Sequence, residues 1–232
     1  MGKLESLESL TRDELFELAK MLDEANYYEE MTVFMRAFIK KDQQELSENE
    51  WRMLLRAYQG VFCKRRFSWR ALTLRQCKET GHEQAITIYK EKVEDELRSC
   101  CCEFLSLLDD MLRTASNAEA RVLYLRAKGD WHRYLCEFSI DEQENTSLSL
   151  QCYEEASEVS EALEPINATR LSLALNFSVF CYETLKQPEK AHAIAKTAFD
   201  EGILSGDTMY LPKDSELNLQ LLHDNLKLWN SD

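Results

Sequence analysis

Residues 47–81 read SENEWRMLLRAYQGVFCKRRFSWRALTLRQCKETG, and this stretch decides the fold class. Ser47, with Glu50 three residues later, forms a capping box, a pattern with which helices begin. Apolar residues then recur at intervals of three and four, as on one face of a helix: Trp51, Leu54, Leu55, Tyr58, Val61 and Phe62. The pattern continues to about Gly81, which predicts a helix of about 30 residues, or about 45 Å.

The same spacing recurs along nearly the whole chain. It predicts two helices before residue 47, a second long helix at about 82–112, and one that begins at Ser116, where Glu119 completes another capping box. After a polar loop near 141–146, we expect helices at 147–163, 168–185, 188–204 and 214–229. Pro188 suits a first helical turn, and Gly202 and Gly206 are expected to mark where the helix at 188–204 ends. No segment is a convincing strand.

Composition fits this interpretation and excludes several classes of protein. The 232 residues include only 6 Gly and 3 Pro, as expected for long helices, and 44% are hydrophobic, too many for a disordered acidic chain. The net charge of −14 argues against binding to nucleic acid or to an anionic membrane. No apolar run approaches 18 residues, so no segment is expected to span a bilayer. We therefore expect one all-α domain over residues 1–232, with residues 1–10 as a flexible N-terminal extension.

The sequence carries no pattern typical of an enzyme or of a metal site. Three of the eight cysteines are adjacent, Cys100 to Cys102, and neighbours on a helix point about 100° apart, so they cannot converge on one metal ion. We expect reduced thiols in a cytoplasmic or nuclear protein. No Ser-His-Asp spacing or glycine-rich phosphate loop is present. We therefore expect no catalytic activity, no cofactor and no metal.

Positive charge is concentrated at Lys64-Arg65-Arg66 and Arg70. Arg66 and Arg70 lie four residues apart, hence on one helix face, in line with Tyr58 and Phe62. Guanidinium groups on such a stripe need an anionic partner, which could be one of the protein's own carboxylates or an external anion.

A second group of residues favours the external anion. Arg133 stands beside Tyr134 in an otherwise apolar helix, and forked guanidinium donors together with a phenol suit a phosphate dianion. Asn176 interrupts a strongly apolar helix between Leu175 and Val179. An amide there bonds either within the core or to the backbone of an extended peptide. The last helix repeats this combination with Leu221, Asn225, Leu228 and Trp229.

Five segments in order make the chain resemble the 14-3-3 family of phosphoserine- and phosphothreonine-binding adaptors: Arg65–Arg70 (RRFSWR), Asp130–Leu135 (DWHRYL), Arg170–Phe180 (RLSLALNFSVF), Ala195–Glu201 (AKTAFDE) and Asp224–Trp229 (DNLKLW). The resemblance covers essentially the whole chain. It implies nine antiparallel helices that form an amphipathic peptide-binding groove and usually dimerise.

The resemblance also implies roles for residues. It assigns the phosphate to Arg66, Arg70, Arg133 and Tyr134. It assigns the client peptide to Asn176, Asn225, Leu175, Val179, Glu183, Leu221, Leu228, Trp229 and Lys128. Two positions depart from the family, because Gln59 stands where a lysine is usual and Asn218 where the wall is usually apolar. We therefore expect phosphopeptide binding that is weaker, or tuned to a different motif.

For the dimer, the resemblance implies an apolar seam formed by Leu15, Met21, Leu22, Ala25 and Tyr89. Glu30 and Lys92 keep one intersubunit ion pair, whereas Tyr27 replaces the basic partner of Glu96. A homodimer is expected, with mixed dimers between paralogues left open. Ser68 lies near the seam in a basic setting, and it is either a phosphorylation site that would disfavour the dimer or an inert buried hydroxyl.

The sequence thus predicts a non-catalytic adaptor that binds phosphorylated segments of client proteins and thereby regulates their activity, localisation or assembly. The alternative is a helical scaffold with weakened or lost phosphate dependence, which would bind acidic or unmodified peptides.

Overall fold

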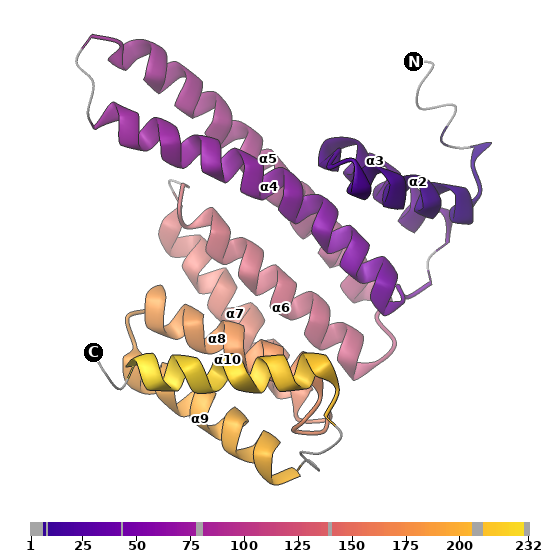
Figure 1. Cartoon of the computed structure of the whole chain (residues 1–232), viewed down its shortest axis with the longest axis vertical. Helices are drawn as coiled ribbons and strands as arrows, with labels where there is room; N and C mark the ends of the chain where they lie inside the picture. The colour runs from indigo at the N-terminus through magenta and orange to yellow at the C-terminus, as the bar shows by residue number, and fades with distance from the viewer. Residues whose placement is uncertain are drawn as a thin grey trace. The chain divides into compact units, whose positions relative to one another are not determined.

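The computed structural model describes residues 7, 9–42, 44–77, 81–138, 141–205 and 211–229. Over these residues the chain forms nine α-helices, α2 to α10, and no strand (Figure 1). The predicted all-α class is therefore confirmed. Most of the expected N-terminal extension (residues 1–6 and 8) and Gly206 lie outside the described residues. The chain divides into two compact units, Met1–Ser106 and Leu107–Asp232, which we describe separately.

The first unit contains α2 (Arg12–Glu24), α3 (Tyr28–Lys41), α4 (Glu48–Gln76) and the part of α5 (Glu83–Thr114) up to Ser106. The capping box predicted at Ser47 is present, because Ser47 accepts from the backbone N–H of Glu50 and Glu50 accepts from that of Ser47. Thr11 and Glu14 form a second capping box at the start of α2, which the sequence analysis missed.

Helices α4 and α5 of this unit pack against each other in opposite directions. Near the start of α4 the Tyr58 ring packs on Phe104, with centroids 4.6 Å apart, and near its end Gln76 donates to Thr87 over 3.1 Å. Between them, Arg65 donates to Glu96 over 3.1 Å. Aromatic rings and hydrogen-bonded polar pairs thus fix the register of the two long helices.

Gly60 is required where α3 packs on α4. A Cβ at this position would lie 2.3 Å from the Tyr28 ring, far inside van der Waals contact. Glycine in a helix interior costs about 0.5–1 kcal/mol relative to alanine, and here the close approach of the aromatic ring offsets that cost. The hydroxyl of Tyr28 donates to Asn26 in the turn before α3 over 2.7 Å.

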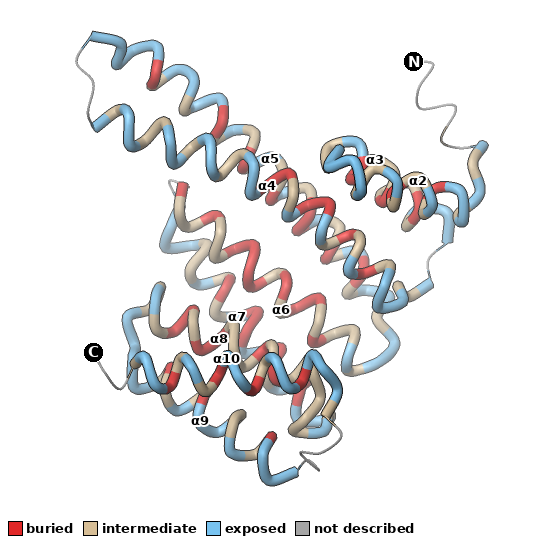
Figure 2. Tube along the Cα trace, in the orientation of Figure 1, coloured by how far each residue is buried: buried red, intermediate tan, exposed pale blue. Residues whose placement is uncertain are grey.

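The second unit contains the end of α5, then α6 (Ala118–Leu135), α7 (Glu142–Ser160), α8 (Ala168–Glu183), α9 (Pro188–Ser205) and α10 (Lys213–Trp229). Buried positions run along α6, as Figure 2 shows. One apolar cluster surrounds Tyr153, which stacks on Phe177 and tilts against Phe180. A second cluster joins α8, α9 and α10 around Leu171, Leu219 and Leu222.

In this unit the predicted starts of α6 and α7 and the expected role of Gly202 were wrong, whereas α9 ends at Ser205, one residue from the predicted end. Helix α6 is capped by Asn117, which accepts from Ala120, and not by Ser116; the Glu119 carboxylate instead accepts from Asn167 and Thr169 at the start of α8. Gly202 lies inside α9, where it makes room for Leu219, whose Cδ2 would lie 2.9 Å from an added Cβ.

Helix α7 begins at Glu142, so the predicted polar loop at 141–146 is largely its first turn and its cap. Acidic residues favour a helix N-terminus because they interact well with its dipole. The side chains of Asn145 and Thr146 also donate to the backbone carbonyls of Asp141 and Glu142, one turn earlier. Polar composition alone was therefore a poor guide to a loop here.

Candidate functional site

Arg65 of α4 stands beside Arg66 in the sequence and pairs with acidic residues of the same unit. Arg65 points towards its own protein: its guanidinium donates to Glu29 over 2.9 Å and to Glu96 over 3.1 Å. Arg66 is half-buried and Arg70 is exposed. Arg65 therefore forms an internal salt bridge, and the choice between an internal and an external anion for Arg66 and Arg70 stays a prediction. Gln59 is exposed and lies on the same side of α4 as Arg66 and Arg70, at about 100° per residue.

In the second unit, α6, α7 and α8 bring three polar side chains together around Asp130. This carboxylate is only 8% exposed. It accepts a hydrogen bond from the Tyr153 hydroxyl over 2.6 Å and from the Asn176 amide Nδ2, at 3.0 Å from Oδ1 and 2.9 Å from Oδ2. The guanidinium of Arg133 lies 3.6 Å from the same carboxylate. Two predicted site residues, Arg133 and Asn176, are thus held by one acid.

Gly129 explains how Tyr153 reaches this acid. A Cβ at Gly129 would lie 3.1 Å from the Tyr153 ring, so a glycine lets the ring lie close to α6. The buried hydroxyl of Ser149 donates to the Gly129 carbonyl over 2.8 Å and ties α7 to α6 at the same level. Gly129 is therefore a packing requirement of the hydrogen-bonded cluster around Asp130.

Electrostatics keep the Arg133 guanidinium charged. Burial lowers the pKa of Arg133, but Tyr153 and Asp130 outweigh it and raise that pKa above its ordinary value. Burial and the adjacent Asp130 raise the pKa of Tyr153 well above its ordinary value, so its hydroxyl stays a donor. The Arg133 side chain is 21% exposed, and its Nε is buried with no hydrogen-bond partner among the described residues. The cluster therefore holds a fixed cation with a spare donor.

The sequence analysis did not name Arg126 as a candidate site residue beside Arg133. It lies seven residues before Arg133, hence on the same side of α6, and its Nε is likewise buried without a partner in the part of the chain that the structure describes. The seven-residue spacing was the signal that could have found it.

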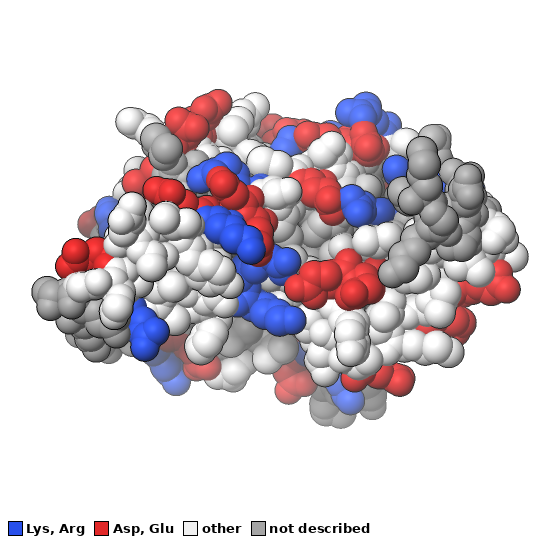
Figure 3. All heavy atoms as spheres, turned by 90° about the horizontal axis from the view of Figure 1, so that it is seen from above, with Lys and Arg blue, Asp and Glu red and all other residues white. Residues whose placement is uncertain are grey.

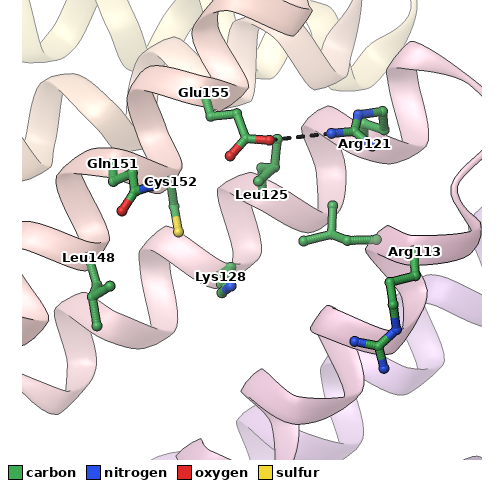
Figure 4. A pocket seen from close by; sticks show the side chains of 9 residues that line it. Arg113, Arg121, Leu125, Lys128, Leu148, Gln151, Cys152 and Glu155 are labelled. Carbon is green, nitrogen blue, oxygen red and sulfur yellow. Dashed lines mark hydrogen bonds and ion pairs between the residues drawn. The ribbon is translucent and has the colours of Figure 1, made fainter.

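Lys128 is placed elsewhere. At about 100° per residue it lies about 140° around α6 from Arg133. Its Nζ donates to Asp109 over 2.6 Å, and it lines an open cavity of about 240 Å³ (Figure 4). Arg121, which pairs with Glu155, and Cys152 line the same cavity. The structure does not bring Lys128 to the Asp130 cluster.

The predicted peptide-contacting residues of α8 and α10 are accessible to different extents. Leu175, Val179 and Asn225 are half-buried, Glu183 is exposed, and Trp229 stacks on Tyr182 with centroids 4.8 Å apart. Helix α10 exposes an apolar stripe spaced by four and seven residues, Leu217 (57% exposed), Leu221 (41%) and Leu228 (59%), of which the sequence analysis missed Leu217.

Asn218 has a role within the protein. Its amide donates to the carbonyl of Ala168 at the start of α8 over 3.2 Å, and Ser215 one turn earlier donates to the carbonyl of Ile166 over 2.8 Å. The side chain that departs from the family's apolar wall thus ties α10 to α8.

The predicted dimer residues of the first unit also fall into two groups. Leu15 is completely buried inside the protomer, whereas Met21 and Tyr89 are more than half exposed. Leu22 is half-buried, and Ala25, Glu30 and Lys92 are exposed. Ser68 is exposed and donates to the Lys64 carbonyl over 3.2 Å, so in the protomer it is not a buried hydroxyl.

Comparison with known proteins gives the family. The model of the 14-3-3 protein family matches residues 18–230. The 14-3-3 protein beta/alpha of Rattus norvegicus is 42% identical over 233 residues, which cover 97% of this chain and 94% of the rat protein. The 14-3-3-like protein GF14 nu of Arabidopsis thaliana is 44% identical over 236 residues, covering 97% and 89% of the two chains.

The chain belongs to the 14-3-3 family. Proteins of the 14-3-3 family are non-catalytic adaptors that bind phosphorylated clients and dimerise, so the expectation of an adaptor is confirmed. Among the described residues, no helix is long and apolar enough to cross a membrane. Acidic side chains are spread over the face seen in Figure 3, with basic ones in smaller groups between them.

Proposed function

We propose that this 14-3-3 protein binds segments of client proteins that carry phosphoserine or phosphothreonine, and thereby regulates their activity, localisation or assembly in the cytoplasm. The observation that carries the proposal is the Arg133 guanidinium, which is charged, fixed beside Asp130, and has a buried Nε without a partner among the described residues. The Arg133 side chain is 21% exposed, and forked guanidinium donors match phosphate oxygens. We assign the phosphate to Arg133 and Tyr134 of α6 and to Arg66 and Arg70 of α4.

The client backbone and side chains are assigned to α8 and α10. Asn176 and Asn225 are half-buried amides on surfaces that also carry exposed or half-exposed leucines. An amide that offers both a donor and an acceptor suits a peptide backbone, which presents both as well. The stripe Leu217, Leu221 and Leu228 would cover apolar client side chains.

Two residues argue for weakened binding. Gln59 places a neutral amide where 14-3-3 proteins usually have a lysine, and one cation near a phosphate is worth about 1 kcal/mol when exposed. Asn218 makes the α10 surface more polar while its amide is engaged by Ala168. We therefore propose lower affinity for a standard phosphoserine peptide than other family members have, or a different preferred motif.

The test is a titration of a fluorescently labelled phosphoserine peptide against its unmodified twin, by anisotropy. We expect at least tenfold preference for the phosphorylated peptide, and weaker binding at higher salt because charge pairs are screened. Arg133→Gln should reduce the affinity about 10- to 100-fold, since a hydrogen bond to a charged group contributes about 1.5–3 kcal/mol. Arg121→Gln is the matched control, because it removes the same charge from a residue that lies about 120° around α6 from Arg133 and pairs with Glu155. Equal affinity for the two peptides would favour the phosphate-independent scaffold, the alternative that Gln59 supports.

We also propose a homodimer formed through Met21, Leu22, Ala25, Tyr89, Glu30 and Lys92. Two protomers would hold two client sites together and raise the affinity for doubly phosphorylated clients. Sedimentation at micromolar concentration tests the dimer. Ser68 is exposed in the protomer, and Ser68→Glu should shift the equilibrium towards the monomer if phosphorylation there controls dimerisation. A variant that sediments like the unmodified protein would contradict that control.

A further inference from the structure

The Asp130 carboxylate determines how the amide group of Asn176 is oriented. An ionised carboxylate only accepts hydrogen bonds, so the amide group that faces it must be the NH2 of Asn176 and never its carbonyl oxygen. The Tyr153 hydroxyl also donates to this carboxylate, and its ring is fixed by the stack on Phe177 at 5.3 Å and 11°. The carboxylate is therefore held from one side by α7 and in turn holds α8.

The remaining atoms of the Asn176 amide are thereby oriented. With Nδ2 bound to both oxygens of Asp130, the carbonyl Oδ1 of Asn176 points away from the carboxylate and accepts no hydrogen bond among the described residues. Asn176 is half-buried and its Oδ1 is not a fully buried atom, so this oxygen is accessible to a visiting chain. If the amide were rotated by 180°, the oxygen would face the carboxylate, which is repulsive.

We propose that Asp130 is a positioning residue that fixes the polarity of the Asn176 amide, so that its carbonyl oxygen is offered to a backbone N–H of the client. This proposal rests on the proposed function for the client, but the orientation of the amide is a property of the free protein. Asp130 also has a second effect, which acts against binding of the phosphate. Its negative charge lies 3.6 Å from the Arg133 guanidinium and therefore weakens the local attraction for an anion.

Asp130→Asn separates the two effects. The new amide has the shape of the carboxylate but only one acceptor oxygen. When that oxygen accepts from Tyr153, the new NH2 faces Asn176, whose own amide must rotate to present its oxygen. The variant therefore reverses the polarity offered to the client and removes the charge beside Arg133.

The expected results differ between two probes. Affinity for the phosphoserine peptide should fall about tenfold in Asp130→Asn. Affinity for phenyl phosphate, which has no backbone amides, should stay the same or increase. A loss of both affinities in parallel would mean that Asp130 merely supports the fold or Arg133, and would overturn the proposal. So would an unchanged or increased affinity for the peptide.

Two further variants guard against trivial explanations. Tyr153→Phe keeps the carboxylate and the ring stack but removes one donor to Asp130, and it should weaken peptide binding by less than Asp130→Asn. Asp200→Asn removes one exposed acid that pairs with Lys196 on α9, and it should change neither affinity, which controls for net charge. In an Asn176→Ala background, Asp130→Asn should no longer weaken peptide binding.

A measurement on the free protein separates this inference from the proposed function. In protein labelled with 15N-asparagine, one side-chain N–H of Asn176 should exchange slowly with water, and its signal should move in Asp130→Asn. If the protein binds no phosphopeptide but this signal behaves as expected, the proposed function fails and the positioning role stands. If Asn176 exchanges as fast as an exposed asparagine and is indifferent to Asp130→Asn, the positioning role is refuted.

Discussion

Replacing Gly60 by alanine gives a quantitative test of the α3–α4 contact. Alanine in a helix interior is favoured over glycine by about 0.8–1 kcal/mol. The new methyl, however, would lie 2.3 Å from the Tyr28 ring, about 1.2 Å short of an ordinary contact of about 3.5 Å. Forcing such a shift in a packed region costs about 1–3 kcal/mol. Gly60→Ala should therefore lower the free energy of unfolding by up to about 2 kcal/mol.

The effect of Gly60→Ala on the free energy of unfolding should change sign when the Tyr28 ring is absent. In a Tyr28→Ala background the methyl meets no ring, and Gly60→Ala should stabilise by about 0.5–1 kcal/mol through helix propensity alone. Ala71→Gly, at an exposed position of the same helix, measures that propensity directly and should cost about the same amount. The assay is urea unfolding of all four variants, followed by circular dichroism. If Gly60→Ala stabilises the protein while Tyr28 is present, the reasoning from the close contact is wrong.

Three further predictions follow from burial and charge. Burial lowers the pKa of His132, although its hydrogen bond to Asn145 acts in the opposite direction. The unfolded chain therefore binds a proton at this histidine more readily than the folded protein does. The urea concentration at the midpoint of unfolding should fall as the pH drops below about 6.5, and it should fall less in His132→Gln. Burial raises the pKa of Cys152 and Cys181 to about 11. After brief iodoacetamide treatment at pH 7.5, mass spectrometry should find these two cysteines unmodified and the exposed Cys63, Cys77 and Cys102 modified. Modification of the buried cysteines before the exposed ones would contradict their burial. Gln59→Lys should raise the affinity for the phosphoserine peptide about 5-fold, and no change at low salt would remove Gln59 as the cause of weakened binding.

Local patterns predicted the helices well because their causes lie within a few residues. The capping box at Ser47 and the proline at the start of α9 involve neighbours three residues apart or fewer, and both were confirmed. The errors arose where a distant residue decides. Glu119 was expected in a capping box, but its carboxylate is engaged by α8, about fifty residues later.

In the candidate site, too, the features decided by neighbouring residues could be predicted and those decided by distant residues could not. Arg133 and Asn176 could be singled out as polar residues in apolar helices. That Asp130 holds Asn176 could not, because this contact joins residues 46 apart in a cluster that depends on a glycine to let Tyr153 approach α6. Lys128 is adjacent in sequence to Gly129 and Asp130, yet the helix turns it to the opposite side.

The pairing of α4 with α5 has a consequence for how this chain can change in length. Three hydrogen-bonded pairs follow one another along the two antiparallel helices: Tyr58 with Glu103, Arg65 with Glu96, and Gln76 with Thr87. An amino acid inserted within either helix would rotate everything beyond it by about 100° and mismatch every later pair at once. One inserted in the connection after Gln76 would leave all pairs intact and lengthen only a short loop, at a cost well below 1 kcal/mol. Insertions and deletions that survive in descendants of this gene should therefore gather at that connection and be missing from both helices.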